Sequence, residues 1–419
     1  MTEADWVRHS IWWQVYPLGF TGAWPDRGDG DGHKLRRLEA WLDYAVELGV
    51  SGLALGPIFA SETHGYDIVD HLRIDPRLGD DGDFDSLVAA AHDRGLRVLL
   101  DGVFNHVGRG HPAFRQVLAD GPEAATASWF RLTWPGPQYD TFEGHGGLVA
   151  LNHREPAVAD LVIEAMNHWL DRGADGWRLD AAYAVPEEFW SSVLPRVRDR
   201  HPDVYVVGEV IHGDYPDVVS RSTMDSVTQY ELWKAIWSAL NEKNFFELDH
   251  ALGRHNDFLD SFVPMTFLGN HDVTRLYSKL TDERNAALAL AVLMTVGGTP
   301  SVYAGDEQGF TGVKEDRESG DDAVRPPFPD KPGDLVPYGW PAYHLHQDLI
   351  GLRRRHDWLH RARTRTVHLT NEQYAYEVSD GDRKLLVCLN LGDEPADVER
   401  GGQEAPVRLD PHSYTIVEG

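Results

Sequence analysis

Cysteine is almost absent from this sequence: its 419 residues include one, Cys388. A single cysteine cannot form a disulfide within the chain, which fits a reducing compartment. Cys388 stands in the mostly apolar run 384–389, so we interpret it as a small core residue. A disulfide-stabilised scaffold is therefore excluded.

Long hydrophobic runs and a secretory leader are also lacking. No stretch approaches the length of about 20 apolar residues that a helix needs to cross a bilayer. Residues 1–5 are acidic, and no apolar leader segment follows them. We therefore expect a cytoplasmic protein with no membrane partner.

Basic residues are scarce relative to acidic ones. Lys and Arg total 39 and Asp and Glu total 67, which gives a formal net charge of −28. A field of that sign repels nucleic acid and anionic membrane surfaces, so we expect neither as a partner. Aromatic residues are plentiful, with 14 Trp and 15 Tyr. This composition is typical of a soluble enzyme that acts on a neutral molecule.

Short apolar runs alternate with segments of helical periodicity through most of the chain. The runs include residues 11–16, 51–55, 96–100, 204–208 and 299–303. Continuous apolar runs of this length are typical of buried parallel strands, with the amphipathic segments as covering helices. About eight strands over this length suit a (β/α)8 barrel. We therefore predict an α/β fold of the TIM-barrel type.

Two segments break the alternation. Residues 107–150 are rich in Gly, Pro, His and Trp and show little periodicity, which indicates a short domain inserted after the third strand. Residues 363–419 contain short alternating segments such as 373–378, typical of a small antiparallel β domain. The catalytic barrel is accordingly assigned to residues 1–106 and 151–362.

An arginine and a carboxylate share one face of the strand expected before residue 180. Alternate side chains of a strand point the same way, so Arg178 and Asp180 face one side and Trp177 the other. A guanidinium beside a carboxylate holds it ionised and fixes its direction. Such a carboxylate at the C-terminal end of a barrel strand suits a nucleophile. A surface ion pair is the alternative interpretation.

Acidic residues follow three other predicted strands. They are Asp101, Glu209 and Asp272, with His106 and His271 beside them. The C-terminal ends of barrel strands meet at one face, so we expect these side chains to share one mouth. Crowded acids repel one another, which makes an idle arrangement improbable, although each acid alone could be a helix cap or a rim charge. Paired carboxylates, one protonated and one ionised, are the groups that cleave glycosidic bonds.

The segments that carry these residues resemble four motifs of the α-amylase family of glycoside hydrolases. They are residues 101–106 (DGVFNH), 176–180 (GWRLD), 206–209 (VVGE) and 267–272 (FLGNHD). Supporting matches in the family's order are residues 13–17, 64–67, 151–158 and 298–307. The resemblance covers the chain from the first predicted strand to the eighth. It implies the barrel fold and an enzyme that acts on α-glycosidic bonds.

The resemblance also implies a retaining mechanism. In it Asp180 would be the nucleophile, Glu209 the general acid/base and Asp272 the stabiliser of the transition state. Retention requires the nucleophile and the acid to lie about 5 Å apart. Glu209 would need a less polar setting than Asp180 to keep its proton.

The other matched side chains would bind or position the sugar. Arg178 would orient the nucleophile, and Tyr66 would stack under the reacting ring. His106 and His271 would hydrogen-bond the hydroxyl groups of that ring. Asp101 would shape the site without touching the substrate.

Two further matches bear on the substrate. Asp67 and Arg325 resemble a pair that holds the non-reducing-end sugar in α-glucosidases, which implies release of glucose or short sugars from α-gluco-oligosaccharides. Arg325 could instead anchor its Pro-rich loop. Residues 181–184 read AAYA where starch-cutting relatives have Ala-Ala-Lys-His, which disfavours a long-chain endo-amylase. Among such relatives, an alanine directly after the nucleophile, as at Ala181, weakly favours α-1,4 over α-1,6 linkages.

No cofactor or metal ion is expected. Asn105 matches a calcium ligand of the amylases, but its acidic partners are not evident, so a structural hydrogen bond is preferred. Asp26, Asp29 and Asp31 form a weakly calcium-like loop whose spacing does not match that of the relatives. The His-x-His pair at 344–346 falls in a predicted helix, which disfavours a metal-dependent hydrolase.

Two other functions stay open beside hydrolysis. A transglycosylase of the same family would use a second sugar in place of water. A non-catalytic relative, such as the heavy chain of amino-acid transporters, is disfavoured because all three acids are present. The expected partner is an oligosaccharide substrate, and the sequence indicates no oligomeric state.

Overall fold

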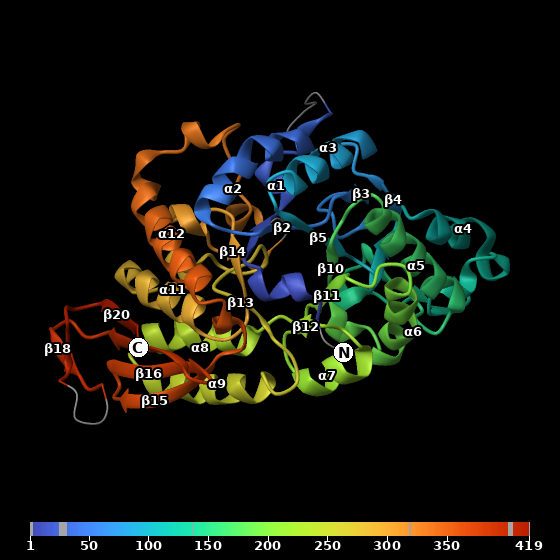
Figure 1. Ribbon diagram of the computed structural model, residues 1–419. Helices are drawn as coiled ribbons and strands as arrows, with labels where there is room; N and C mark the ends of the chain where they lie inside the picture. The colour runs from blue at the N-terminus through green and yellow to red at the C-terminus, as the bar shows by residue number, and fades with distance from the viewer. Residues whose placement is uncertain (1–2, 25–31, 137, 318–319, 401–404, 419) are drawn as a thin grey trace.

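Eight parallel strands form the centre of the molecule, a computed structural model that describes residues 3–24, 32–136, 138–317, 320–400 and 405–418 (Figure 1). In sheet order after β1 (Trp12–Val15) they are β2 (Gly52–Leu55), β5 (Arg97–Gly102), β10 (Gly176–Leu179), β11 (Tyr205–Gly208), β12 (Ser226–Val227), β13 (Met265–Phe267) and β14 (Thr299–Tyr303). Strand β14 pairs with β1, and a parallel bridge from Thr228 to Met265 joins the remaining edges. The predicted (β/α)8 barrel is confirmed.

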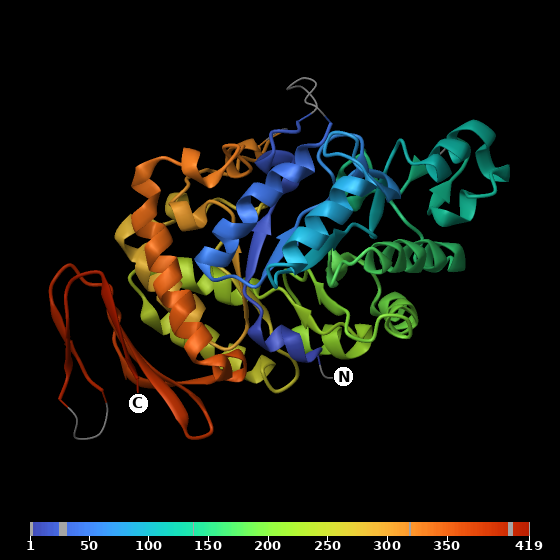
Figure 2. The same ribbon diagram turned by 45° about the horizontal axis from the view of Figure 1, so that its top comes forward.

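Helices surround this barrel (Figure 2). The α-helices outside the insert are α1 (Pro17–Phe20), α2 (Leu42–Leu48), α3 (Asp81–His92), α5 (Pro156–Asp171), α6 (Glu187–Arg198), α7 (Tyr215–Ser222), α8 (Tyr230–Asn241), α9 (Phe245–Phe258), α10 (Leu276–Lys279), α11 (Ala286–Thr295) and α12 (Trp340–Arg355). Helix α2 ends at Gly49, whose φ of 96° is the left-handed conformation that glycine adopts without strain. Helix α3 starts at a capping box formed by Asp80 and Asp83.

Short 3-10 helices connect these elements. They are η1 (Asp5–His9), η2 (Lys34–Trp41), η3 (Gly121–Glu123), η4 (Ala127–Trp129), η5 (Phe142–Gly144), η6 (Ala182–Ala184), η7 (Glu283–Asn285), η8 (Asp306–Gln308), η9 (Asp322–Val324), η10 (Pro332–Asp334), η11 (Pro337–Gly339) and η12 (Asp357–Arg361). No helix in the described part of the chain combines the length and the apolar character that crossing a membrane requires.

The alternation of side chains along the strands separates two apolar layers. Trp177 and Leu179 of β10 are fully buried in the large core between the sheet and the helices. Inside the barrel a smaller cluster fills the end opposite the strand C-termini, and it contains Trp12, Leu99 and Tyr205. This cluster occupies the N-terminal end of the barrel interior. The polar side chains of β5 and β10 that point inward therefore lie at the open, C-terminal end.

Two antiparallel excursions leave the barrel between its strands. The segment after β2 contains a hairpin, β3 (Phe59–Ser61) and β4 (Ile68–Ile74). The loop at its tip holds residues 64–67, so the pairing of the two strands fixes the position of Tyr66.

The insert after the third barrel strand contains regular structure. Strand β6 (His106–Gly108) pairs with β9 (Leu148–Ala150), and between them lie α4 (Pro112–Asp120), β7 (Leu132–Thr133) and β8 (Gln138–Tyr139). Helix α4 was not expected from the sequence. Its Phe114 and Val117 are fully buried, which shows that this small unit has apolar packing of its own.

A separate antiparallel sheet follows α12, as predicted. It contains β15 (Arg363–Leu369), β16 (Gln373–Asp380), β17 (Arg383–Asn390) and β20 (Ser413–Glu418) in that order, beside the pair β18 (Ala396–Val398) and β19 (Val407–Leu409). The sheet packs on the barrel helices through Tyr374 against Phe245 and through a 2.9 Å hydrogen bond between Tyr376 and Thr295. Cys388 is fully buried in this sheet.

Candidate active site

A cavity of about 720 Å³ lies where the barrel strands end. The predicted site residues among those lining it are Tyr66, His106, Asp180, Glu209, Asp272 and Arg325. Asp180 and Glu209 follow β10 and β11 directly, and Asp272 lies in the loop that follows β13. Tyr66 and His106 come from the β3–β4 hairpin and the start of the insert. Strand ends far apart in sequence therefore bring three acids into one cavity.

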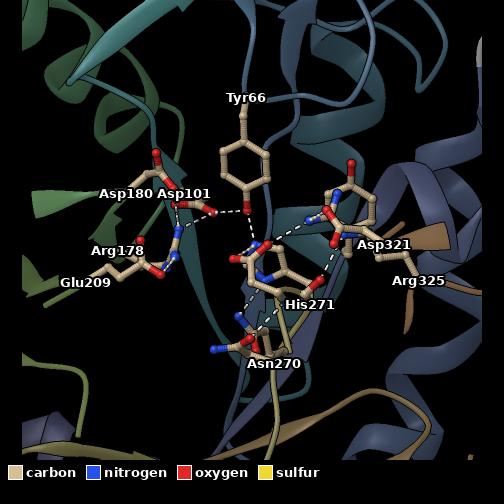
Figure 3. Close-up of polar contacts among 12 residues, drawn as sticks. Tyr66, Asp101, Arg178, Asp180, Glu209, Asn270, His271, Asp321 and Arg325 are labelled. Atoms are coloured by element: carbon tan, nitrogen blue, oxygen red, sulfur yellow. Dashed lines mark hydrogen bonds and ion pairs between the residues drawn. The ribbon is translucent and has the colours of Figure 1, made fainter. Parts of the chain in front are cut away.

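Arg178 contacts three carboxylates at the base of this cavity (Figure 3). Its Nη1 donates to both oxygens of Asp101, at 2.6 and 2.8 Å, and to Oδ1 of Asp180 at 3.2 Å. Its Nη2 lies 2.8 Å from Oε1 of Glu209. The register of the sheet places Arg178 opposite Asp101, and strand alternation turns it to the same side as Asp180. All four side chains are buried.

One positive charge is thus shared by three buried acids. Burial raises the pKa of Asp101 and raises the pKa of Asp180 well above its usual range, while the charge of Arg178 acts in the opposite direction. A single guanidinium balances one negative charge, so the cluster favours a state in which at least one carboxyl keeps its proton. At Asp180 burial outweighs the charge of Arg178, which is contrary to the expectation that the guanidinium alone holds this carboxylate ionised.

Glu209 is held from two further directions. The backbone N–H of Ala181 donates to its Oε2 at 3.0 Å, and the hydroxyl of Tyr230 donates to its Oε1 at 3.1 Å. Ala181 adopts a φ of 45°, a left-handed conformation that turns the chain sharply after β10. Asn270 donates to the Tyr230 hydroxyl at 2.9 Å. Glu209 therefore has a fixed position against Arg178.

Asp272 has a different electrostatic setting. Its Oδ1 accepts a 2.7 Å hydrogen bond from Arg325, and its Oδ2 lies 3.0 Å from Nε2 of His271. Burial by itself raises the pKa of Asp272, but the nearby charges of His271 and Arg325 outweigh burial and hold the pKa well below its ordinary value. Asp272 is therefore ionised more readily than Asp101 or Asp180.

Tyr66 and the two histidines complete the polar wall. The Tyr66 hydroxyl hydrogen-bonds Oδ2 of Asp101 at 3.1 Å and also contacts Nε2 of His271 (Figure 3). Burial lowers the pKa of His106 to about 3, so its ring is neutral. Nε2 of His106 is buried without a hydrogen-bond partner among the described residues. Such an atom beside a cavity fits a ligand hydroxyl group.

Comparison with known proteins identifies the family that has this arrangement. The model of the α-amylase catalytic domain matches residues 14–334. This chain belongs to the α-amylase family of glycoside hydrolases. A cyclomaltodextrinase of Geobacillus thermopakistaniensis strain MAS1 is 30% identical over 426 residues, which cover 94% of this chain and 71% of that protein.

Other members of the α-amylase family are similar in sequence or in structure. The intracellular maltogenic amylase of Bacillus subtilis strain 168 is 30% identical over 337 residues, 74% of this chain and 57% of that protein. The structure of the cyclic α-maltosyl-(1→6)-maltose hydrolase of Arthrobacter globiformis, in complex with that cyclic sugar, superposes with a TM-score of 0.88 and 26% identity over the full length of both chains. The predicted family and enzyme class, an α-glycoside hydrolase, are confirmed.

Asp67 and Arg325, which resemble the sugar-holding pair of α-glucosidases, have different surroundings in this structure. Arg325 lines the cavity, and its guanidinium contacts Asp272 and lies 3.0 Å from Asp321. Asp67 accepts hydrogen bonds from the N–H and the hydroxyl of Thr63, and it is not among the described residues that line the cavity. The clamp of Asp67 and Arg325 stays a prediction. For Asp67 to bind a sugar, its hydrogen bonds from Thr63 would have to break.

Asn105, which was considered for calcium, is not among the described residues that line this cavity. Asn105 donates a 3.1 Å hydrogen bond to Nδ1 of His106, which agrees with the structural role preferred for it. Asp26, Asp29 and Asp31 fall outside the described residues. The described side chains include one group with ligand atoms close enough for a metal, which is His33, Asp80 and Asp83. Its carboxylates already accept the hydrogen bonds of a helix cap, so the group has a structural explanation.

Several residues of the site escaped sequence reasoning. Tyr230 and Asn270 fix Glu209, and Glu143 and Tyr183 line the cavity from opposite chain segments. Asn270 stands inside the motif at 267–272, which is the one signal that pointed to it. Tyr183 stands in the segment 181–184, where the sequence departs from the starch-cutting relatives. Tyr230 lies at the start of α8 and Glu143 in the insert, where no motif marks them.

Proposed function

We propose that this enzyme hydrolyses α-gluco-oligosaccharides with retention of configuration, releasing glucose or short sugars. The observation that carries the proposal is the shared contact of Asp180 and Glu209 with Arg178. Two carboxylates that contact one guanidinium lie near each other, which supports the spacing of about 5 Å that retention requires.

The chemistry proceeds in two displacements. In the first, an oxygen of Asp180 attacks the anomeric carbon while Glu209 gives its proton to the departing glycosidic oxygen. In the second, Glu209 removes a proton from water, which attacks the same carbon and releases Asp180. Asp272, ionised between His271 and Arg325, faces the positive charge that develops on the ring. Arg178 holds the carboxylates of Asp180 and Glu209 in position during both displacements.

The proposed substrate class has two sources of support. Two of the similar proteins, the cyclomaltodextrinase and the cyclic maltosyl-maltose hydrolase, are named for small α-glucans, and the maltogenic amylase is named for forming maltose. The cavity volume lies within the range of small-ligand sites. A cytoplasmic location is proposed with the same oligosaccharide substrates, supported by the word intracellular in the name of the Bacillus relative.

Product analysis tests this proposal. The protein is incubated with maltose, isomaltose, panose, maltotriose and pullulan, and the anomer released first is observed by proton NMR. We expect the α anomer and free glucose or maltose from the short substrates. First release of the β anomer contradicts retention, and products longer than the substrate, exceeding free glucose, indicate transglycosylation instead.

Two variants connect the reaction to its residues. Asp180→Asn and Glu209→Gln keep the side-chain volume but remove the nucleophile or the proton donor, so turnover should fall by at least about 10³-fold. Asp160→Asn is the matched control, because Asp160 forms an exposed ion pair with Arg196 on the outside of the barrel. Equal activity of Asp180→Asn and the control would remove Asp180 from the mechanism.

A further inference from the structure

A buried ion pair lies behind the loop that carries Asp272. Nη1 of Arg275 donates to Oδ1 of Asp306 at 2.8 Å, and its Nη2 donates to the carbonyl oxygen of Ala304 at 3.0 Å. The side chains of Arg275 and Asp306 are 1% and 5% exposed, and neither is among the described residues that line the cavity. The two displacements therefore use neither group directly.

The ion pair fixes the C-terminal end of the loop, which covers residues 268–275 between β13 and α10. The guanidinium of Arg275 lies 4.3 Å from the ring centre of Tyr303 in β14, and its backbone N–H donates to the carbonyl oxygen of Gly312 at 3.0 Å. In the described part of the chain, Asp306 is the one acid that pairs with Arg275. The position of Arg275 therefore depends on Asp306.

Asp306 also meets the N-terminal end of this loop. A methyl group on Gly269 would lie 2.7 Å from Oδ2 of Asp306, which is closer than a carbon and an oxygen atom pack. Chain neighbours aside, the described atoms within 4 Å of that methyl group all belong to Asp306. The backbone of Gly269 is not left-handed, so glycine serves here for the close approach.

The residues between these two ends act in the reaction. The N–H of Asp272 donates to Oδ1 of Asn270 at 2.9 Å. Asn270 in turn donates to the hydroxyl of Tyr230, which donates to Glu209. One carboxylate outside the cavity thus contacts both ends of the segment that carries Asp272.

We propose that Asp306 is a positioning residue, which holds the loop 268–275 at both ends and thereby sets the place of Asp272 against the reacting sugar. The inference rests on the proposed glycosidase function and deepens it. Asp272 stabilises a positive charge that develops only in the transition state, so a displaced loop lowers kcat and leaves KM nearly unchanged. A displacement of about 1 Å at a reacting centre can cost about 100-fold in rate.

Replacing Asp306 with alanine removes both contacts. Burial raises the pKa of Asp306 to about 6, so the carboxylate is ionised at pH 7, where the assays are run. For Asp306→Ala we expect kcat on maltotriose to fall about 100-fold, with KM within about twofold of the wild type. A similar loss is expected on α-glucosyl fluoride, whose leaving group needs no proton, because the ring charge develops with either substrate. Asp306→Asn keeps the size and an acceptor oxygen for Arg275, so it should recover about tenfold of the lost kcat.

A second variant approaches the same contact from the loop. Gly269→Ala introduces a methyl group that pushes the loop away from Asp306, and kcat should fall about tenfold at unchanged KM. In the Asp306→Ala background that space is open, so adding Gly269→Ala should cause no further loss.

Asp225→Ala is the matched control. The side chain of Asp225 is buried and pairs with Arg198 at 3.0 Å, and neither residue lines the cavity. This variant should melt at a lower temperature and keep the kcat of the wild type. Thermal melting verifies that each variant is folded before its kinetics are compared.

The outcomes are distinguishable. A kcat of Asp306→Ala equal to that of the control overturns the inference, and so does a loss that appears in KM alone. A loss confined to maltotriose also overturns it, because it places the effect on proton transfer by Glu209. If Asp306→Ala does not fold, an unchanged kcat of Gly269→Ala overturns the inference by itself. Absence of wild-type activity on both substrates contradicts the proposed function rather than the role of Asp306.

Discussion

Replacing Arg178 with glutamine removes the guanidinium that contacts Asp101, Asp180 and Glu209. The three carboxylates stay buried, and no other cation is recorded against Asp180 among the described residues. Leaving a buried charge without its partner costs about 3–5 kcal/mol of unfolding free energy. We therefore expect Arg178→Gln to be less stable than the wild type by about that amount at pH 7.

The loss should depend on pH in a defined direction. Burial already raises the pKa of Asp101 and Asp180, and removing Arg178 raises both further. A carboxyl whose pKa is raised by folding is favoured in its neutral form, so its stabilisation is complete below its unfolded pKa of about 4 and is lost as the pH rises through the folded pKa. The deficit of Arg178→Gln should therefore shrink from pH 7 toward pH 5.

Urea unfolding, monitored by tryptophan fluorescence, measures this difference in unfolding free energy at pH 5, 6 and 7. Arg198→Gln is the matched control. Nη2 of Arg198 lies 3.0 Å from Oδ2 of Asp225, whose side chain is buried, and neither residue lines the cavity. That variant should lose stability but keep activity, whereas Arg178→Gln should lose both. Arg178→Lys keeps the charge without the planar fork and should regain stability more than activity. A deficit for Arg178→Gln that is absent at pH 7, or equal at all three pH values, refutes the reasoning.

Two further predictions concern other buried groups, and a third concerns metal removal. His106→Ala should lower kcat/KM on maltotriose about 10- to 100-fold without changing the acidic limb of the pH profile, because the pKa of His106 is already about 3; a shifted acidic limb contradicts this. Burial raises the pKa of Glu307 to about 7, so the stability contributed by its neutral carboxyl is lost as the pH rises from about 4.5 to 7. The unfolding free energy of Glu307→Gln relative to that of the wild type should therefore rise by about 3 kcal/mol over this interval. A difference that does not change with pH contradicts this prediction. Dialysis against EDTA should leave activity and melting temperature unchanged, and recovery of lost activity by calcium would restore the metal hypothesis.

Much of the barrel and the position of the acids could be predicted because both follow strand geometry. Apolar runs mark buried parallel strands, and alternation places Arg178 and Asp180 on one face with Trp177 on the other. An acid directly after a strand must lie at the C-terminal mouth of the barrel. These patterns are local in the sequence, and the barrel brings the residues that carry them into one cavity.

The contacts between segments could not be predicted in the same way. The distribution of one guanidinium over Asp101, Asp180 and Glu209 depends on the register of neighbouring strands, which the sequence does not display. Thr63 hydrogen-bonds Asp67 because the β3–β4 hairpin brings them together, and no motif marks the two strands of that hairpin. Glu143 has no motif, and its place follows from an irregular turn within the insert.

Trapping of the glycosyl-enzyme tests most directly whether Asp180 attacks the sugar while Glu209 supplies the proton. The Glu209→Gln variant is treated with 5-fluoro-α-glucosyl fluoride, whose fluoride leaves without protonation, and is digested and analysed by mass spectrometry. We expect one added fluoroglucosyl group on the peptide that contains Asp180, and none in the double variant with Asp180→Asn. A label on another residue, or turnover of the reagent to the inverted sugar with no label, would contradict it.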